Sequence, residues 1–291
     1  MRILVFGAGV IGRVYSARLS LAGHVVTLLA RGPTAVQLAA SGVRIAPEGQ
    51  PPVDAQLAVV TDVSTVDQFD LAFIAVRRDQ IEGAASAIGK IHAHIIVSLI
   101  DLPVGLDFLA KVVGPRRYVA AFPGIGGRIN DQGVVEFIDV RQQPTTIQVG
   151  PDSSTVADVL NSAGFRTAVV PDMTSWLESH AVFICAIESA IVAENGDLAA
   201  LAANRNKTRK LVLRIRKDLR ALHRTGTQVT PKSLRLIFLR LPVWFATAYW
   251  MHQLSGPLGR VALLPHSMAS RDTELPALQH DIALITTPVV P

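Results

Sequence analysis

Short apolar runs alternate with amphipathic segments through the first half of the chain. The runs typical of buried strands are residues 3–6, 24–29, 71–76 and 95–99, and the helical patterns between them cover 10–22, 33–40 and 79–90. This alternation is typical of a parallel α/β sheet. The stretch 46–56 contains three prolines and a glycine and is predicted to be a loop.

The pattern changes near residue 171. Before it, 134–138, 145–149 and 166–170 are predicted strands, with a helix over 154–163. After it, helical patterns dominate over 173–194, 198–225 and 232–254. Pro171 and Asp172 suit the end of a strand and the cap of a helix. We therefore predict two domains, an α/β domain over 1–171 and a mostly helical domain over 172–291.

Composition excludes several protein classes. Hydrophobic residues make up 49% of the chain and charged residues 18%, the opposite of a disordered protein. The single cysteine, Cys185, excludes an internal disulfide and a zinc site built from several cysteines. Its apolar neighbours predict an inert core thiol. His92 and His94 share one strand face, but no further ligand stands at metal spacing, so no metal site is expected.

The net charge of +5 is concentrated in one segment. Residues 204–224 hold nine Lys or Arg and one acid, which leaves a net charge of −3 on the remainder. The interleaved apolar residues Leu211, Val212, Leu213, Ile215, Leu219 and Leu222 predict a helix with one buried stripe and a solvated basic face. Binding of a phosphate or polyanion by that face is the alternative. No nucleic-acid motif accompanies it, so nucleic acid is not an expected partner.

Two segments resemble membrane or export signals. Residues 2–12 place a positive charge before an apolar run, as a signal peptide does, but the glycines in that run have the spacing of a functional motif. Residues 241–259 lack acidic residues, Lys and Arg, yet prolines, glycines and polar residues interrupt them. The sequence therefore predicts a cytoplasmic protein that does not bind a membrane.

A glycine-rich pattern follows the first predicted strand. Its residues are Gly7, Ala8, Gly9, Val10, Ile11 and Gly12, which match G-x-G-x-x-G between a strand and a helix. In a dinucleotide-binding domain the first glycine permits the turn, the second lets the pyrophosphate approach, and the third allows close helix–strand packing. The helix N-terminus then favours the negative phosphates. The context predicts a Rossmann-type doubly wound fold for 1–171.

The end of the second predicted strand indicates which dinucleotide is bound. NAD-binding domains usually place a carboxylate there, whereas this chain has Arg31 and no acid before Glu48. An arginine can bind a 2′-phosphate through charge-assisted hydrogen bonds. NADP(H) is therefore the expected cofactor, and a surface arginine without a ligand is the alternative.

Several motifs resemble the ketopantoate reductase (2-dehydropantoate 2-reductase) family. They are the glycine pattern, the segments 22–32, 41–45 and 70–80, and more loosely 144–146, 176–180, 226–231 and 273–275. The resemblance implies a Rossmann domain, a helical second domain and NADPH-dependent reduction of a carbonyl. It also implies cofactor contacts by Arg77, in the place of the family's lysine, and by Gln80. Glu274 matches a family carboxylate that orients substrate or cofactor.

The chain departs from the family where the chemistry is performed. The family's general-acid lysine is matched by Glu178, and an asparagine one turn later is matched by Val182. The family's Asn-Gly near the nicotinamide is matched by Asp101-Leu102. These changes make the expected site more negative, whereas a lysine would stabilise the alkoxide left by hydride transfer. By resemblance, Glu178, Glu274 and Asp101 are the candidate catalytic residues.

Three interpretations of Glu178 stay open. A protonated Glu178, raised in part by burial beside Val182 and Cys185, would donate a proton to a neutral ketone. An ionised Glu178 would stabilise a cationic iminium, and an inert Glu178 would mean lost activity. His180 lies on another side of the helix, so we expect a structural histidine packed near Trp176.

The sequence thus predicts an NADP(H)-dependent oxidoreductase that acts on a small molecule other than ketopantoate. The alternative is a catalytically inactive NADP(H)-binding sensor or interaction protein. Arg77, Arg78 and Arg128 are candidates for replacing the missing positive charge. The aromatic residues of 232–264 suit either core or a homodimer surface, and they leave the oligomeric state open.

Overall fold

The computed structural model describes residues 1–63 and 68–287, and its contacts divide the chain into two units. The first unit contains Met1–Ile100 and Gly105–Met173, and the second contains Asp101–Val104 and Thr174–Pro291. The predicted boundary at residue 171 lies two residues before the end of the first unit. The short segment Asp101–Val104 belongs to the helical unit, although it follows a strand of the sheet along the chain.

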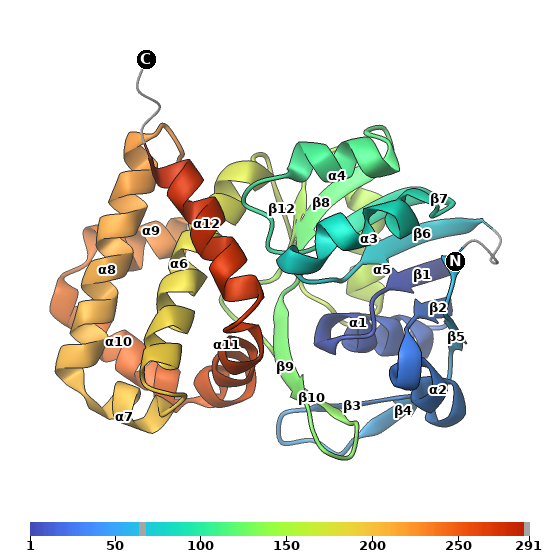
Figure 1. Cartoon of the computed structure of the whole chain (residues 1–291), viewed down its shortest axis with the longest axis horizontal. Helices are drawn as coiled ribbons and strands as arrows, with labels where there is room; N and C mark the ends of the chain where they lie inside the picture. The colour runs from blue at the N-terminus through green and yellow to red at the C-terminus, as the bar shows by residue number, and fades with distance from the viewer. Residues whose placement is uncertain (64–67, 288–291) are drawn as a thin grey trace. The chain divides into compact units, whose positions relative to one another are not determined.

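The first unit is built on an eight-stranded sheet (Figure 1). Its strands, in spatial order, are β12 (Thr167–Val170), β11 (Thr145–Gln148), β8 (Tyr118–Phe122), β7 (Ala93–Leu99), β6 (Phe69–Ile74), β1 (Arg2–Phe6), β2 (Val25–Leu29) and β5 (Ala58–Val60). All neighbours are parallel except β8 and β11. The near-continuous burial of β1, β6 and β7 is typical of a parallel sheet covered on both faces.

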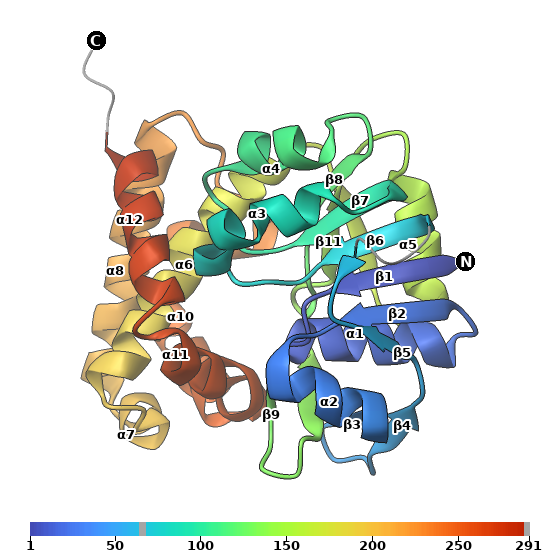
Figure 2. The ribbon, with the colours of Figure 1, turned by 45° about the vertical axis from the view of Figure 1, so that its right-hand side comes forward.

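The order of the central strands confirms the predicted doubly wound fold. The chain leaves β1 toward β2 on one side and returns to β6 on the other, so the direction reverses between β1 and β6. Figure 2 shows β1, β2 and β6 side by side. In open α/β sheets, ligands bind outside the carboxyl ends of the strands at this reversal. Gly7 follows β1 directly, so the glycine pattern lies at the reversal.

Helices connect the parallel strands. They are α1 (Val10–Leu21), α2 (Gly32–Ser41), α3 (Ile81–Gly89), α4 (Leu106–Val113) and α5 (Ser153–Ser162). Right-handed crossovers place α1 and α3 on opposite faces of the sheet, because they lead away from the reversal in opposite directions. Figure 1 shows α3 and α4 together on one face. On the other face, Tyr15 of α1 stacks on Phe165 at 4.2 Å and bonds Thr145 through its hydroxyl.

The prediction of a loop over 46–56 was right for 48–52 and 56 and wrong for the strand residues on either side of the turn. This region contains part of β3 (Val43–Pro47) and all of β4 (Val53–Ala55), which join β10 (Val135–Asp139) and β9 (Ile125–Ile129) in a four-stranded sheet. Val43 pairs with Ala55 across the hairpin. The prolines occupy the end of β3 and the turn, where no ladder hydrogen bond is lost. They mark a hairpin turn rather than a long loop.

The second unit is helical. Its helices are α6 (Met173–Ala193), α7 (Leu198–Ala203), α8 (Arg205–Arg224), α9 (Lys232–Arg235), α10 (Val243–Ser255), α11 (Leu264–Ser270) and α12 (Glu274–Thr286), with π-helical turns over Leu236–Arg240 and Leu258–Leu263. One apolar core joins α6, α7, α8 and α10. The predicted helical character of this region is confirmed.

Two predicted helices are each broken in the structure. The helix expected over 198–225 divides at Asn204, whose side-chain oxygen accepts hydrogen bonds from the amides of Asn206 and Lys207 and caps α8. The helix expected over 232–254 divides at Leu241, which is extended because Pro242 follows it. The apolar periodicity runs across both breaks and therefore hid them.

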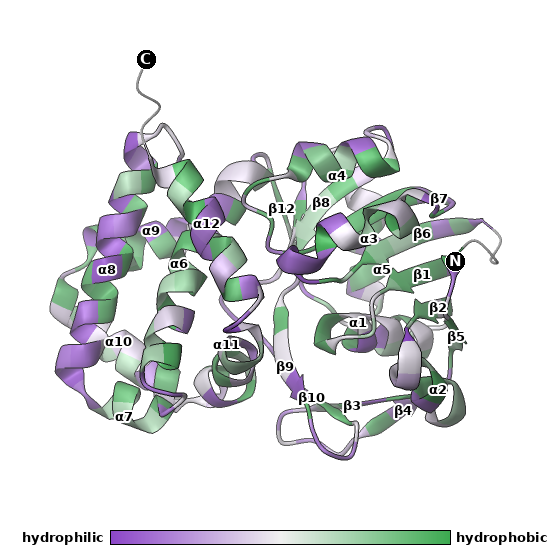
Figure 3. Ribbon diagram, viewed as in Figure 1, coloured by the Kyte–Doolittle hydropathy of each residue, from purple (hydrophilic) through white to green (hydrophobic). Residues whose placement is uncertain are grey.

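The basic helix α8 has the predicted two faces. Its buried residues include Leu211, Ile215, Leu219 and Leu222, and most of its Lys and Arg side chains are exposed. Figure 3 shows the same alternation of hydrophobic and hydrophilic bands along α8. The inclusion of Leu213 in the buried stripe was wrong, since it is exposed. Leu213 lies two residues after Leu211, which is about 200° around the helix and therefore on the opposite face.

One described helix, α6, is long and apolar enough to cross a membrane by length and composition alone. In the structure, 56% of its most apolar window is buried, and the core helix of a soluble protein passes the same test. It is therefore weak support for a membrane span.

The aromatic residues of α10 have two kinds of surroundings. Trp250 is buried against Phe183 and Phe238, whereas Trp244 and Phe245 are exposed.

Candidate active site

The turn after β1 requires glycine at its first position. Gly7 has φ of +114°, and a Cβ there would lie 2.4 Å from the carbonyl oxygen of Ala75, just beyond β6. The Gly7 amide donates a hydrogen bond of 3.2 Å to the Leu29 carbonyl at the end of β2. The strands on both sides of β1 therefore hold the turn in place.

Gly9 and Gly12 have opposite surroundings. A Cβ at Gly12 would lie 1.8 Å from the Gly7 carbonyl oxygen, so only glycine lets α1 approach the turn this closely. A Cβ at Gly9 would meet nothing within 4 Å, so the backbone is open on that side. Gly9 caps α1, whose first amides, those of Val10 and Ile11, have no partner within the helix. The open side and these amides fit a pyrophosphate.

Arg13 supports this loop, and the sequence analysis did not single it out. Its side chain is buried on α1, and its Nε donates a hydrogen bond of 2.8 Å to the Ala8 carbonyl. Burial lowers the pKa of the Arg13 guanidinium. The bond holds the backbone between Gly7 and Gly9. An arginine one turn after the second glycine was the available signal, although periodicity alone does not distinguish it from a solvated residue.

Arg31 lies where the cofactor prediction requires a cation. It follows β2, is exposed, and occupies the cap position of α2. Farther along, Arg77 and Gln80 cap a short turn before α3, where the Arg77 amide donates a 3.1 Å hydrogen bond to Gln80 Oε1. Gln80 therefore has a structural role in the turn after β6. Its predicted contact with a cofactor stays a prediction.

Two of the arginines considered as replacements for the lysine have carboxylate partners. Arg78 pairs with Glu82 at 2.9 Å, one turn along the chain, and Arg128 pairs with Glu136 at 2.7 Å across the β9–β10 hairpin. The carboxylate in each pair partly neutralises the charge of its arginine. Arg77 is the third of these candidates.

In the second unit, Glu178 is half-buried on α6. Its Oε2 accepts a hydrogen bond of 2.6 Å from the Thr227 hydroxyl. Next to it, the Thr230 amide donates to Ser179 Oγ at 3.1 Å. These two bonds tie the segment after α8 to α6.

Asp101 and His180 form a pair that the sequence analysis did not predict. His180 Nδ1 lies 3.0 Å from Asp101 Oδ2, and both side chains are about nine-tenths buried. The His180 ring also stacks on Trp176, with centroids 5.2 Å apart and planes 6° apart, as expected for packing one turn away. Asp101 and His180 stand 79 residues apart, and no local pattern connects them.

Glu274 lies in a different group of side chains on the same unit. It is buried in the first turn of α12, with Oε2 3.8 Å from His266 Nε2. The same nitrogen lies 3.0 Å from Oε1 of Glu188, which is fully buried on α6. Glu188 is ten residues beyond Glu178, about 15 Å along the helix axis. Glu178, Asp101 and Glu274 therefore contact different partners.

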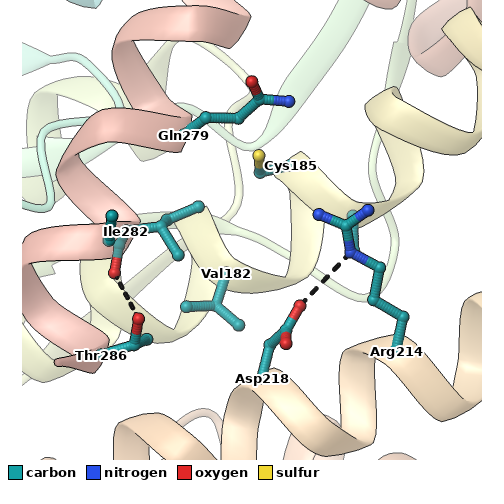
Figure 4. Close-up of a pocket in the computed structure, with 9 residues that line it drawn as sticks. Val182, Cys185, Arg214, Asp218, Gln279, Ile282 and Thr286 are labelled. Carbon is teal, nitrogen blue, oxygen red and sulfur yellow. Dashed lines mark hydrogen bonds and ion pairs between the residues drawn. The ribbon is translucent and has the colours of Figure 1, made fainter.

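A cavity of about 390 Å³ lies between α6, α8 and α12 (Figure 4). Val182 and Cys185 line it from α6, and Arg214 and Asp218 form an ion pair at 3.5 Å on the α8 side. Thus Val182 and Cys185 share one helix face, as predicted. Among the described residues, no group of three or more His, Cys, Asp or Glu side chains could hold a metal ion.

Comparison with known proteins finds a matching family and a relative in sequence. A sequence profile described as "Ketopantoate reductase PanE/ApbA" matches residues 3–151. A 2-dehydropantoate 2-reductase of Archaeoglobus fulgidus is 26% identical over 191 residues, which are 64% of this chain and 62% of that protein. The chain therefore spans less than two thirds of the length of that relative.

Solved structures with the same fold cover nearly the whole chain. The 2-dehydropantoate 2-reductase of Porphyromonas gingivalis W83 superposes with a TM-score of 0.68 at 16% identity, covering 99% of each chain. A D-mandelate dehydrogenase solved with NADH and anilino(oxo)acetate superposes with a TM-score of 0.70 at 14% identity, covering 98% of this chain and 97% of that one. At these identities, the likeness shows the fold.

The different surroundings of Gly9 and Gly12 predict different effects of the same substitution. Gly9→Ala should leave the melting temperature without ligand unchanged but weaken NADPH binding, because its methyl group enters the open side. Gly12→Ala should lower the melting temperature sharply, because the new Cβ meets a backbone oxygen. Gly83→Ala on α3 has open surroundings and is the matched control. Thermal melting with and without NADPH measures both effects. Equal melting temperatures for Gly9→Ala and Gly12→Ala would contradict this account of the loop.

The buried thiol predicts a distinct pH dependence of labelling. Burial, with a smaller contribution from Glu188, raises the pKa of Cys185 to about 12. Alkylation of the native protein by iodoacetamide should therefore keep accelerating from pH 7 to 10, whereas the urea-unfolded chain should level off above an ordinary thiol pKa of about 8.5. Because the unfolded thiol ionises first, its contribution to folding stability falls as the pH rises above that value. Cys185→Ala is the blank, and a native plateau near pH 8.5 would contradict the prediction.

Proposed function

Because this chain belongs to the ketopantoate reductase PanE/ApbA family, we propose that it is an NADP(H)-dependent oxidoreductase that reduces a carbonyl or imine other than ketopantoate. The observation that carries the proposal is the glycine turn at the reversal of the sheet. Gly7 and Gly12 are closed in by backbone atoms, whereas Gly9 is open. This is the combination that a dinucleotide pyrophosphate requires.

Residues of the first unit are candidates for contacts along the dinucleotide. The amides of Val10 and Ile11 would bind the pyrophosphate, Arg13 holds the loop through Ala8, and Arg31 would bind the 2′-phosphate. Arg77, just after β6, is the candidate for a contact nearer the nicotinamide. When bound, the cofactor supplies the hydride. The NADH in the D-mandelate dehydrogenase structure makes NAD(H) the competing cofactor, and Arg31 favours NADP(H).

Charge in the second unit argues against an anionic substrate. Glu178 stands where the family has its lysine, and its Oε2 accepts a hydrogen bond from Thr227. Ketopantoate is a 2-oxo acid, and a carboxylate at position 178 would repel it. A neutral ketone or a cationic iminium suits this charge, with Glu178 and Glu274 as the candidates for facing it.

A nucleotide-binding protein without turnover is the second candidate. The specific observation in its favour is that neither the lysine nor the asparagine of the family pattern is present, since Glu178 and Val182 occupy those positions. Both candidates require NADPH binding. Only the enzyme oxidises NADPH in a panel of ketones, aldehydes and imines. The cytoplasmic location and a homodimer stay predictions for either candidate.

The cofactor assignment is tested at Arg31. Arg31→Ala should raise the Kd for NADPH by about 10- to 100-fold, since a hydrogen bond to a charged group contributes about 1.5–3 kcal/mol. The Kd for NADH should change little, because NADH lacks the 2′-phosphate. Quenching of tryptophan fluorescence measures both constants. Arg44→Ala, which removes an exposed arginine paired with Asp54, is the control. An equal loss for both dinucleotides would contradict the role of Arg31.

The substrate proposal is tested at position 178. Glu178→Lys should raise kcat/KM for ketopantoate by about 100-fold or more, because a lysine supplies both positive charge and a proton. NADPH oxidation followed at 340 nm measures the rate. Asp158→Lys on the exposed side of α5 makes the same charge change elsewhere and should have no effect. A wild-type kcat/KM for ketopantoate of about 10⁴ M⁻¹s⁻¹ or more would overturn the proposal, because that is an ordinary enzyme rate.

A further inference from the structure

Reduction of a ketone requires a proton donor that the family pattern no longer provides in this chain. Hydride transfer to the carbonyl carbon leaves negative charge on the oxygen, which must take up a proton. Glu178 has replaced the family's lysine, and its Oε2 accepts a hydrogen bond from Thr227. An ionised carboxylate has no proton to donate. The inference that follows rests on the proposed reductase function and concerns the group that donates this proton.

We propose that His180, held by Asp101, donates this proton in place of the missing lysine. Asp101 Oδ2 lies 3.0 Å from His180 Nδ1, and the ring stacks almost parallel on Trp176. A carboxylate at one ring nitrogen fixes the tautomer and the orientation of the ring, as it does in hydrolase triads. With Nδ1 directed at Asp101, a transferred proton leaves from Nε2. His180 is the catalytic acid and Asp101 is the positioning residue.

Glu178 and His180 have different partners, although both belong to α6. Glu178 contacts Thr227, in the segment that follows α8, whereas His180 contacts Asp101. The pair of His180 and Asp101 is therefore separate from the contact that Glu178 makes.

The other carboxylate oxygen of Asp101 is a second, independent sign of a ligand. Asp101 Oδ1 is buried and has no hydrogen-bond partner among the described residues. A buried carboxylate oxygen without a donor is unfavourable, so such atoms in native proteins require an explanation. A hydroxyl or N–H group of a bound ligand would supply the donor. Asp101 would then contact both His180 and the ligand.

The step balances in atoms and charge. The carbonyl carbon receives the hydride, the π electrons of the C=O bond move to the oxygen, and the oxygen takes the proton from His180 Nε2. The products are the alcohol, the oxidised dinucleotide and a neutral imidazole, which regains a proton from water. A preformed iminium ion already carries the positive charge, so its reduction by hydride needs no proton.

This difference between substrates provides the test. Wild-type protein and His180→Gln are assayed with a ketone found in the panel and with an N-alkylated cyclic iminium. Loss of a general acid should lower kcat/KM for the ketone by about 10²–10⁴-fold and leave the iminium rate and the Kd for NADPH nearly unchanged. His252→Gln, at an exposed position on α10, is the matched control. Melting temperatures confirm that each variant is folded.

Asp101→Asn keeps the shape of the positioning residue and removes its charge. It should lower kcat for the ketone and leave KM nearly constant, which a general loss of structure would not do. If His180→Gln does not fold, His180→Gly with added imidazole replaces it, and imidazole should restore ketone reduction. His180→Gly with added imidazole is also used if the iminium is not a substrate.

The outcomes separate the dyad from the proposed function. A ketone rate unaffected by His180→Gln, or equal losses for ketone and iminium, would overturn the dyad and leave the reductase assignment in place. If imidazole does not restore ketone reduction by His180→Gly, and Asp101→Asn keeps the wild-type kcat, the dyad is overturned and the reductase assignment again stays in place. A wild-type protein that binds NADPH and reduces no compound in the panel would overturn both.

Discussion

The close contact between α1 and the turn after β1 determines where the N-terminus of this helix lies in the first unit. A Cβ at Gly12 would lie 1.8 Å from the Gly7 carbonyl, and one at Gly7 would lie 2.4 Å from the Ala75 carbonyl, so no side chain fits at either position. This close packing directs the N-terminus of α1 toward the reversal between β1 and β6. The roles proposed for Gly9 and Arg13 depend on the helix beginning there, where its first amides would attract phosphate.

The three acids proposed for the site in the second unit have different surroundings. Glu178 accepts a hydrogen bond from the Thr227 hydroxyl. Asp101 has a histidine as its partner, and Glu274 lies near His266 and the buried Glu188. A shared fold does not decide what such a set of acids does, because function resides in sites rather than in folds.

Local patterns predicted much of the architecture, and their failures have physical causes. The strands of the main sheet other than β5 and β8, and helices α1, α3, α5 and α6, follow from periodicity, because burial of a strand or helix face repeats along the chain. The break at Asn204 and the hairpin over 43–55 were missed. In both, a few residues with turn or capping chemistry decide the structure, while the apolar pattern favours continuity. Leu213 is a further example, because it is apolar and was expected to be buried but lies on the exposed face of its helix.

For the site, the division follows the range of the interactions. The glycine spacing, Arg31 after the second strand and the departure at Glu178 are all visible in the sequence, because each depends on neighbours within a few residues. The bond from Thr227 to Glu178 and the pair of Asp101 with His180, 79 residues apart, come from packing between segments. Periodicity places a side chain on a face of its own helix. It carries no information about which distant segment will cover that face, since many segments of similar hydrophobicity can do so.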